Sequence, residues 1–147
     1  MSVVGHSSSE EVDNALFDDD CHHGDDRERD RLRESEVTVF PVADIDERGI
    51  APVMQEALDV TTGTDALHVS LDLDALDPTE APGVGTPVRG GITYREAHTA
   101  MELVHDHAGG ALAALELVEV NPILDQHNRT AELAVELAAS TLGQQTL

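Results

Sequence analysis

The chain has 147 residues, about one domain of polypeptide, with 40% hydrophobic residues, three aromatic residues and one cysteine. It carries 30 acidic residues against 8 basic ones, all arginine, which gives a formal net charge of −22. This balance excludes nucleic acid and anionic membrane surfaces as partners, because both bind positive charge, and one cysteine excludes an internal disulfide.

The acidic surplus also runs through the apolar-patterned part of the chain, for example over residues 75–82 and 131–140. Molar salt screens such self-repulsion, since the Debye length falls to about 3 Å at 1 M. The composition therefore favours a halophilic protein over an ordinary acidic protein with a disordered tail. We expect it to be cytoplasmic, because neither a signal peptide nor an apolar run of membrane-spanning length stands out.

Residues 1–25 are rich in Ser and Asp and lack a sustained apolar period, which predicts a disordered acidic segment ahead of a domain over 26–147. Residues 18–26, DDDCHHGDD, contain the side chains of a metal site. A solvated acidic tract is the favoured interpretation, because adjacent residues do not share a face of a helix or strand.

The pattern becomes periodic from residue 26. A charged helix or turn over 26–35 leads to a short strand over 37–40, and 44–60 predicts an amphipathic helix. Residues 66–73 are read as apolar on both faces, which predicts a strand buried on both sides of a parallel sheet. The apolar stripe of the predicted helix consists of Ile50, Val53, Met54, Ala57 and Leu58.

Residues 74–92 form a loop with three prolines and four glycines, and loops of this length usually carry function. Thr93 and Glu96 then make a capping box at the start of a helix that stops near Gly109. Residues 111–120 predict a second buried strand.

Asn128 is expected to cap a final helix that ends at Gly143. Strand and helix alternate along the whole periodic part, which predicts an α/β fold with a parallel sheet. Ligands bind such sheets beyond the carboxyl ends of the strands, where Asp72, Asp74 and Glu119 lie.

Asp72 and Asp74 are two positions apart, so an extended backbone would point both carboxylates the same way. A hard cation explains such a pair, since unpaired buried carboxylates repel one another. An EF-hand is excluded, because Gly83 stands where its twelfth-position Glu is needed. The alternative is that the acids cap loop N–H groups, and this is the better interpretation for Asp77, which precedes a proline.

Residues 70–91, SLDLDALDPTEAPGVGTPVRGG, resemble the third signature of the ureohydrolases, the arginase and agmatinase family. Residues 90–103 resemble the helix after that loop, and residues 117–143 resemble the family's last strand, loop and helix. Within that family, residues 93–96 (TYRE) and 119–122 (EVNP) resemble arginases, especially the bacterial type, more than agmatinases. The resemblance covers about residues 26–143.

The resemblance implies a three-layer α/β/α fold with a parallel sheet, of which only the C-terminal half is present. It implies hydrolysis of L-arginine to ornithine and urea by a dimanganese-bound hydroxide. Asp72 would bridge both Mn²⁺ ions and Asp74 would bind one of them. Glu119 would accept the substrate guanidinium, Thr86 would lie beside it, and Asp25 would contact the α-amino group.

The family's four other metal ligands come from two earlier motifs, one of them Asp-x-His-x-Asp, and neither occurs in this sequence. We therefore expect impaired activity of the isolated chain. The alternatives are a non-catalytic fragment or partner that completes an oligomer or a split arginase, with a homo-oligomer or a partner chain supplying the missing half, and an unfolded relic.

Overall fold

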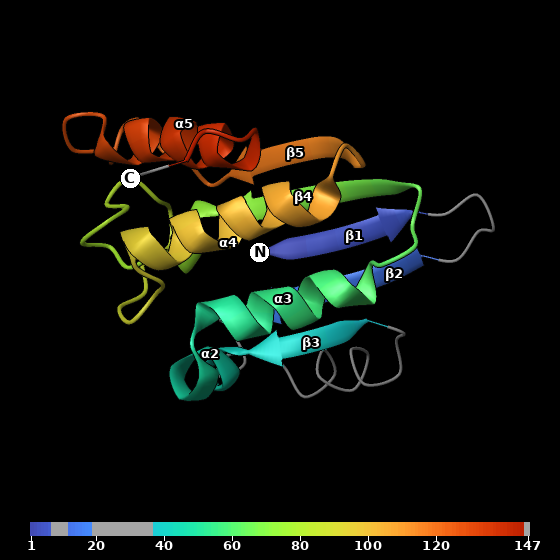
Figure 1. Ribbon diagram of the computed structural model, residues 1–147. Coiled ribbons are helices and arrows are strands. Elements are labelled where there is room, and N and C mark those ends of the chain that lie inside the picture. Colours follow the sequence, from blue (N-terminus) through green and yellow to red (C-terminus); the bar gives the residue numbers. More distant parts are fainter. Residues whose placement is uncertain (7–11, 19–36, 146–147) are drawn as a thin grey trace.

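The computed structural model describes residues 1–6, 12–18 and 37–145. These residues form a five-stranded sheet in the order β3-β2-β1-β4-β5, with helices packed on one face (Figure 1). The strands are β1 (Ser2–His6), β2 (Val12–Asp18), β3 (Thr38–Pro41), β4 (Ala66–Asp72) and β5 (Leu112–Val118). The helices are α2 (Val42–Arg48), α3 (Ile50–Val60), α4 (Tyr94–Ala108) and α5 (Arg129–Thr141).

The strands run parallel to one another, as expected for the predicted sheet, except for β1. β2 pairs in parallel with β3, β4 pairs in parallel with β5, and β1 is antiparallel to both β2 and β4. β2, β3, β4 and β5 therefore all run the same way. The predicted α/β class with a parallel sheet is confirmed for these strands, and β1 is an antiparallel strand inserted among them.

The prediction of loop or disorder is wrong for residues 2–6 and 12–18, which form β1 and β2. Each of these strands lies between two neighbours in the sheet. β1 and β2 pair with each other and with the more distant β4 and β3, and this pairing does not need a local apolar period. The predicted boundary at residue 25 lies outside the described residues.

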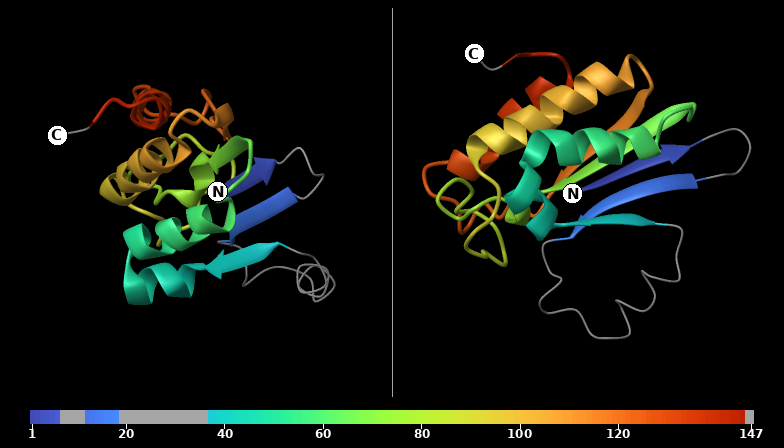
Figure 2. Two further views of the ribbon diagram at one scale, coloured as in Figure 1. Left: turned by 45° about the vertical axis from the view of Figure 1, so that its right-hand side comes forward. Right: turned by 60° about the horizontal axis from the view of Figure 1, so that its bottom comes forward.

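The helices α3, α4 and α5 lie side by side on one face of the sheet (Figures 1 and 2). The core lies between them and the sheet, and its largest fully buried side chains include Leu58, Leu71, Met101 and Leu137. Within the described ranges, no helix covers the opposite face of the sheet (Figure 2). The second helical layer of the predicted arrangement is therefore not among these residues.

The amphipathic helix predicted over 44–60 is two helices. Gly49 has φ of +82°, a backbone conformation that side chains disfavour, and it separates α2 from α3. The predicted apolar stripe is confirmed, because the buried residues of α3 are Ile50, Val53, Met54, Ala57 and Leu58.

The burial of β4 and β5 differs from the prediction. In β4, the buried Leu67, Val69 and Leu71 alternate with half-buried residues, so only one face is fully covered. In β5 no residue is buried, because β5 is the last strand in the sheet order. The prediction of strands buried on both faces is therefore wrong for both.

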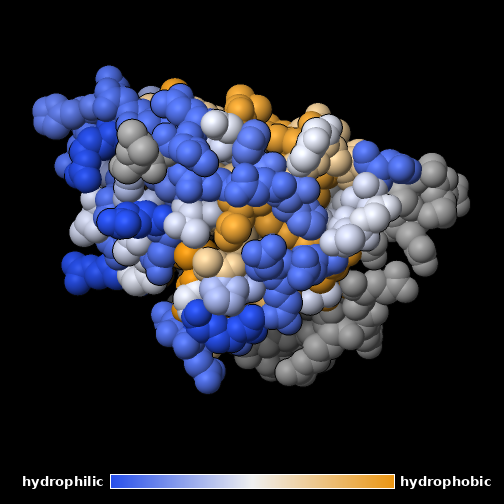
Figure 3. Space-filling view, in the orientation of Figure 1, coloured by the Kyte–Doolittle hydropathy of each residue, from blue (hydrophilic) through white to orange (hydrophobic). Residues whose placement is uncertain are grey.

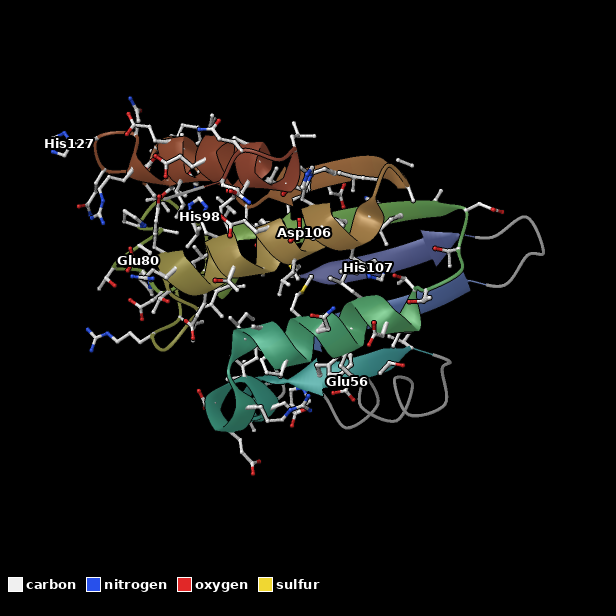
Figure 4. All side chains as sticks on the ribbon, viewed as in Figure 1. Glu56, Glu80, His98, Asp106, His107 and His127 are labelled. Atoms are coloured by element: carbon white, nitrogen blue, oxygen red, sulfur yellow. The ribbon has the colours of Figure 1, made fainter. Side chains whose placement is uncertain are left out.

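The two ends of α4 match the prediction. Thr93 and Glu96 form the capping box, and Gly109 ends the helix in the left-handed conformation. Within the helix, the buried His98 places Nδ1 2.8 Å from Ser140 Oγ and thereby links α4 to α5 (Figure 4). No helix in the described part of the chain is long and apolar enough to cross a membrane.

Candidate metal and substrate site

Asp72 and Asp74 lie at the carboxyl end of β4. Asp72 is the last residue of the strand, and its carboxylate accepts a hydrogen bond from the Asp74 N–H at 3.1 Å. Asp74 lies in a 3-10 turn, η1 (Leu73–Ala75), so the expected extended i, i+2 arrangement is wrong. The turn still keeps the two carboxyl groups close enough for their charges to interact.

Thr86 and Glu119 approach this pair from the loop and from β5. Thr86 Oγ1 donates a hydrogen bond to Asp74 Oδ2 at 2.9 Å. Glu119 directly follows β5, whose last residue is the register partner of Asp72. A Cβ placed on Gly85 would lie 3.2 Å from Glu119 Oε2, so this carboxylate reaches the loop beside Thr86. The structure thus brings together Asp72, Asp74, Thr86 and Glu119.

Glu119 also has an unusual backbone. Its φ is +65°, in the left-handed region, although it is not glycine. Such a conformation costs about 1–3 kcal/mol and persists only where the surroundings hold it, commonly at binding sites. This observation supports a functional role for Glu119 independently of its sequence motif.

The surroundings of Asp72 disfavour the ionised form of its carboxyl group. Partial burial raises the pKa of its carboxyl group, and the nearby charges of Asp74 and Glu119 raise it further, against the stabilising Asp74 N–H. Carboxylates that raise one another's pKa are stabilised in the ionised form by a cation between them. Oxygen ligands suit hard ions such as Mn²⁺ or Mg²⁺.

Without metal, the Asp72 carboxyl should make the chain less stable as the pH rises. The folded chain binds the proton of the Asp72 carboxyl more tightly than the unfolded chain does. The protonated carboxyl therefore contributes its full stability to the fold below the unfolded pKa of about 3.9. This contribution is lost as the pH rises through the raised pKa of the folded chain. The gain in unfolding free energy from Asp72→Asn should therefore be larger at about pH 8 than at about pH 5. Urea unfolding of the unmodified chain and of Asp72→Asn, with a metal chelator present, measures this difference in unfolding free energy. An equal difference at the two pH values would contradict the prediction.

Asp77 shapes the loop, as predicted. Its Oδ1 accepts hydrogen bonds from the Thr79 N–H and hydroxyl at 2.9 and 2.7 Å, and its Oδ2 accepts one from the Gly90 N–H at 2.9 Å. Bonds from the Thr79 hydroxyl and N–H and from the Gly90 N–H hold the pKa of the Asp77 carboxyl below its usual value. Asp77 thus ties both ends of the loop to one side chain.

The middle of the loop is bound to the start of α5. The Gly83 N–H donates to Thr130 Oγ1 at 2.7 Å, and the Gly83 carbonyl accepts from the Asn121 N–H at 2.8 Å. The Asp125 carboxylate accepts from the Thr130 and Ala131 N–H groups at 3.0 and 3.1 Å. Burial opposes ionisation of Asp125, yet these N–H groups lower the pKa of its carboxyl group.

Capping of α5 therefore differs from the prediction. Asn128 occupies the cap position with φ of +62°, but its side chain makes no capping hydrogen bond, and Asp125 fills that role from the preceding turn. Sequence reasoning missed Asp125, because capping residues are sought next to the helix. The helix ends as expected, with Gly143 at φ of +100° following the cap residue Leu142.

Asp125→Ala should lower the free energy of unfolding by about 1–2 kcal/mol, the usual effect of losing a helix cap. The contribution is present above the unfolded pKa of about 3.9 and is lost as the pH falls through the lowered folded value. Asn128→Gly is the matched control, and it should leave stability unchanged because glycine accepts a positive φ. Equal effects of the two substitutions in urea unfolding would contradict this assignment.

The remaining candidate residues fall in a part of the chain that the structure does not describe. Asp25 and the DDDCHHGDD tract, apart from the backbone of Asp18, lie outside the described residues. Among residues 1–6, 12–18 and 37–145, no three His, Cys, Asp or Glu side chains are arranged to hold a metal ion. Asp72 and Asp74 therefore fit a hard cation by their chemistry but supply only part of a ligand shell.

Comparisons with known proteins identify the family of the chain. The arginase family matches residues 20–143. The arginase of Bacillus subtilis strain 168 is 50% identical over 123 residues, which cover 84% of this chain and 41% of that protein. A crystal structure of the Bacillus subtilis arginase has a TM-score of 0.81 at 47% identity, covering 90% of this chain and 48% of that one.

A more distant structure, the formimidoylglutamase of Bacillus subtilis, has a TM-score of 0.76 at 26% identity and covers 87% of this chain and 39% of that one. The predicted resemblance to bacterial-type arginases is confirmed, and the chain spans 41% of the length of the curated relative from Bacillus subtilis. The matched residues contain β4, the loop that follows it, α4, β5 and Glu119. The chain belongs to the arginase family.

Proposed function

We propose that this chain supplies part of the active site of a manganese-dependent ureohydrolase that hydrolyses L-arginine to ornithine and urea. The observation that carries the proposal is the grouping of Asp72, Asp74, Thr86 and Glu119 at one end of β4 and β5, within the family match. These residue types suit a cationic substrate beside a divalent metal ion.

Each residue has a distinct role in this proposal. Asp72 and Asp74 hold Mn²⁺, whose Lewis acidity makes water nucleophilic at neutral pH. The Thr86 hydroxyl donates to Asp74 and fixes the orientation of that carboxylate, while its oxygen can still accept a substrate N–H. The exposed Glu119 carboxylate accepts two guanidinium N–H groups in a charge-assisted pair. Asp25 remains a proposed contact for the substrate α-amino group.

The same proposal limits what the isolated chain does. Two carboxylates fill only part of a binuclear shell, and no third ligand is present among the described residues. We therefore propose that activity requires ligands from the part of an arginase-type protein that this chain does not span. The coverage of 41% of the Bacillus subtilis relative supports this. A non-catalytic partner that completes an oligomer or split enzyme is the second candidate.

An assay of the purified chain in Mn²⁺ separates these possibilities from an enzyme that is complete by itself. The chain alone should release no urea from L-arginine or agmatine above the rate of a matched Asp72→Asn sample. Urea release that depends on Mn²⁺ and is lost in Asp72→Asn would show that the argument from an incomplete shell is wrong.

We further propose a cytoplasmic protein adapted to high salt, on the basis of its net charge of −22. Salt screens repulsion among the carboxylates, so the midpoint of thermal unfolding should rise between about 0.1 M and about 2 M NaCl. Calorimetry at matched pH measures this midpoint. A midpoint that falls or stays constant with salt would contradict the halophilic proposal, and absence of a cooperative transition would indicate an unfolded relic.

A further inference from the structure

The Gly83 peptide is the point at which the loop after β4 meets two other parts of the chain. Its N–H donates to Thr130 Oγ1 at 2.7 Å, and its carbonyl accepts from the Asn121 N–H at 2.8 Å. Thr130 lies in the first turn of α5 and is fully buried, and Asn121 lies two residues after Glu119. A Cβ on Gly83 would stand 2.5 Å from Asp125 Cβ and 2.7 Å from Asp125 Cα, so the contact is close.

The Thr130 hydroxyl is not needed to cap α5. The Asp125 carboxylate accepts the N–H groups of Thr130 and Ala131 at the start of this helix. The Thr130 hydroxyl oxygen accepts the Gly83 N–H instead, and a buried N–H without an acceptor is unfavourable. This hydroxyl therefore acts on the loop and not on its own helix.

Beyond Gly83 the loop becomes exposed. Residues 85–90 all lie at the surface, and hydrophilic residues cover the end of the molecule at which this loop lies (Figure 3). Thr86 belongs to this exposed stretch, yet its hydroxyl reaches Asp74 Oδ2 at 2.9 Å. The position of Thr86 therefore depends on the hydrogen bonds that anchor the stretch, at Gly83 before it and at Gly90 at its end.

We propose that Thr130 is a positioning residue for the metal site and acts on the Asp74 carboxylate through Gly83 and Thr86. This rests on the proposed function, in which Asp74 binds Mn²⁺. Thr130 fixes the orientation of the Gly83 peptide, three residues before Thr86. The Thr86 hydroxyl in turn fixes the orientation of the Asp74 carboxylate. Without the Thr130 acceptor, the Gly83 N–H turns toward another acceptor, and the exposed stretch after it shifts.

Thr130→Val keeps the shape of the side chain and removes the acceptor. It should lower the affinity of the folded chain for Mn²⁺ by at least about threefold, a smaller loss than the 10–100-fold that is typical for a direct hydrogen-bond partner of a metal ligand. Thr130→Ser keeps the hydroxyl and should restore the affinity. Electron paramagnetic resonance of free Mn²⁺ in about 1 M NaCl measures the affinity, at conditions under which urea unfolding shows every variant to be folded.

Thr141→Val is the matched control. Thr141 is also buried on α5, and its hydroxyl donates to the Leu137 carbonyl at 2.9 Å, at the other end of the helix. The control thus removes a buried, hydrogen-bonded hydroxyl from the same helix without removing a bond to the loop. It should leave the Mn²⁺ affinity unchanged.

A double-mutant cycle separates positioning from a general effect on the fold. Thr86→Val should lower the Mn²⁺ affinity by about tenfold, because it removes the direct partner of Asp74. Adding Thr130→Val to this variant should lower the affinity no further, since Thr130 acts on Asp74 only through Thr86. If Thr130→Val does not fold, Thr130→Cys provides the same comparison, because sulfur is a weaker acceptor than a hydroxyl oxygen.

Unchanged affinity in Thr130→Val, an equal loss in Thr141→Val, or losses that multiply in the double variant would each overturn the positioning role. In these cases, a loss of affinity in Asp72→Asn would leave the metal site of the proposed function standing. Equal affinity in Asp72→Asn and the unmodified chain would contradict the proposed function, and the positioning role with it.

Discussion

Replacing Asp72 or Asp74 with asparagine should lower the affinity of the chain for Mn²⁺ by at least about tenfold. Loss of a mere hydrogen-bond partner of a metal ligand typically costs 10–100-fold in affinity, so loss of a direct ligand should cost no less. The effect should be large in either variant, because the two carboxyl groups lie together at the end of β4 and the Asp72 carboxylate is already destabilised without a cation.

Electron paramagnetic resonance of free Mn²⁺, recorded in about 1 M NaCl, measures this affinity, since salt at that concentration suppresses diffuse binding to an acidic surface. Glu80→Gln is the matched control, because Glu80 lies in the same loop (Figure 4), and within the described residues its side chain makes no hydrogen bond or ion pair with Asp72 or Asp74. Equal affinity in Asp72→Asn, Asp74→Asn and Glu80→Gln would show that Mn²⁺ binds this chain only through its overall charge.

Gly91→Ala should lower the free energy of unfolding by about 3 kcal/mol, the upper end of the usual cost of overpacking. A Cβ at Gly91 would stand 2.5 Å from the Leu76 carbonyl carbon, 2.6 Å from the Ala75 oxygen and 2.6 Å from the Asp77 nitrogen. All three are backbone atoms at the base of the loop, so no side-chain rotation relieves the clash. The loop must then separate from the segment that carries Asp77.

Gly85→Ala provides the contrast in the same loop. The only close neighbour of its new methyl group is Glu119 Oε2 at 3.2 Å, the end of a flexible side chain that can move aside. Its cost should be under about 1 kcal/mol. Urea unfolding of the two variants measures the difference, and a Gly91→Ala midpoint equal to that of the unmodified chain would refute the close-packing argument.

The parts of the fold that local chemistry determines were predictable from the sequence. The apolar stripe of α3 follows from residue spacing, the start of α4 from the Thr93 and Glu96 pair, and the role of Asp77 from the proline after it. Each of these features involves residues close together in the chain. The end of β4 was likewise identified from its run of acids.

Features that depend on distant residues were not predictable. β1 and β2 exist because they pair within a sheet, and β5 is exposed because no described strand lies beyond it. Two local features were missed as well: Asp125 caps α5 from the preceding turn, and a 3-10 turn at Asp74 replaces the expected extended backbone. The family resemblance already placed Thr86 beside Glu119, but the hydrogen bond from Thr86 to Asp74 required the structure.

The rate of Mn²⁺-dependent urea release from L-arginine by this chain, co-expressed and purified with the N-terminal part of the Bacillus subtilis arginase, tests the central claim most directly. With the N-terminal part of the Bacillus subtilis arginase bound, the chain should release urea, and the complex with Asp72→Asn should release none above background. A stable, manganese-loaded complex that releases no urea, or one that releases it equally well with Asp72→Asn, would contradict the assignment of this site.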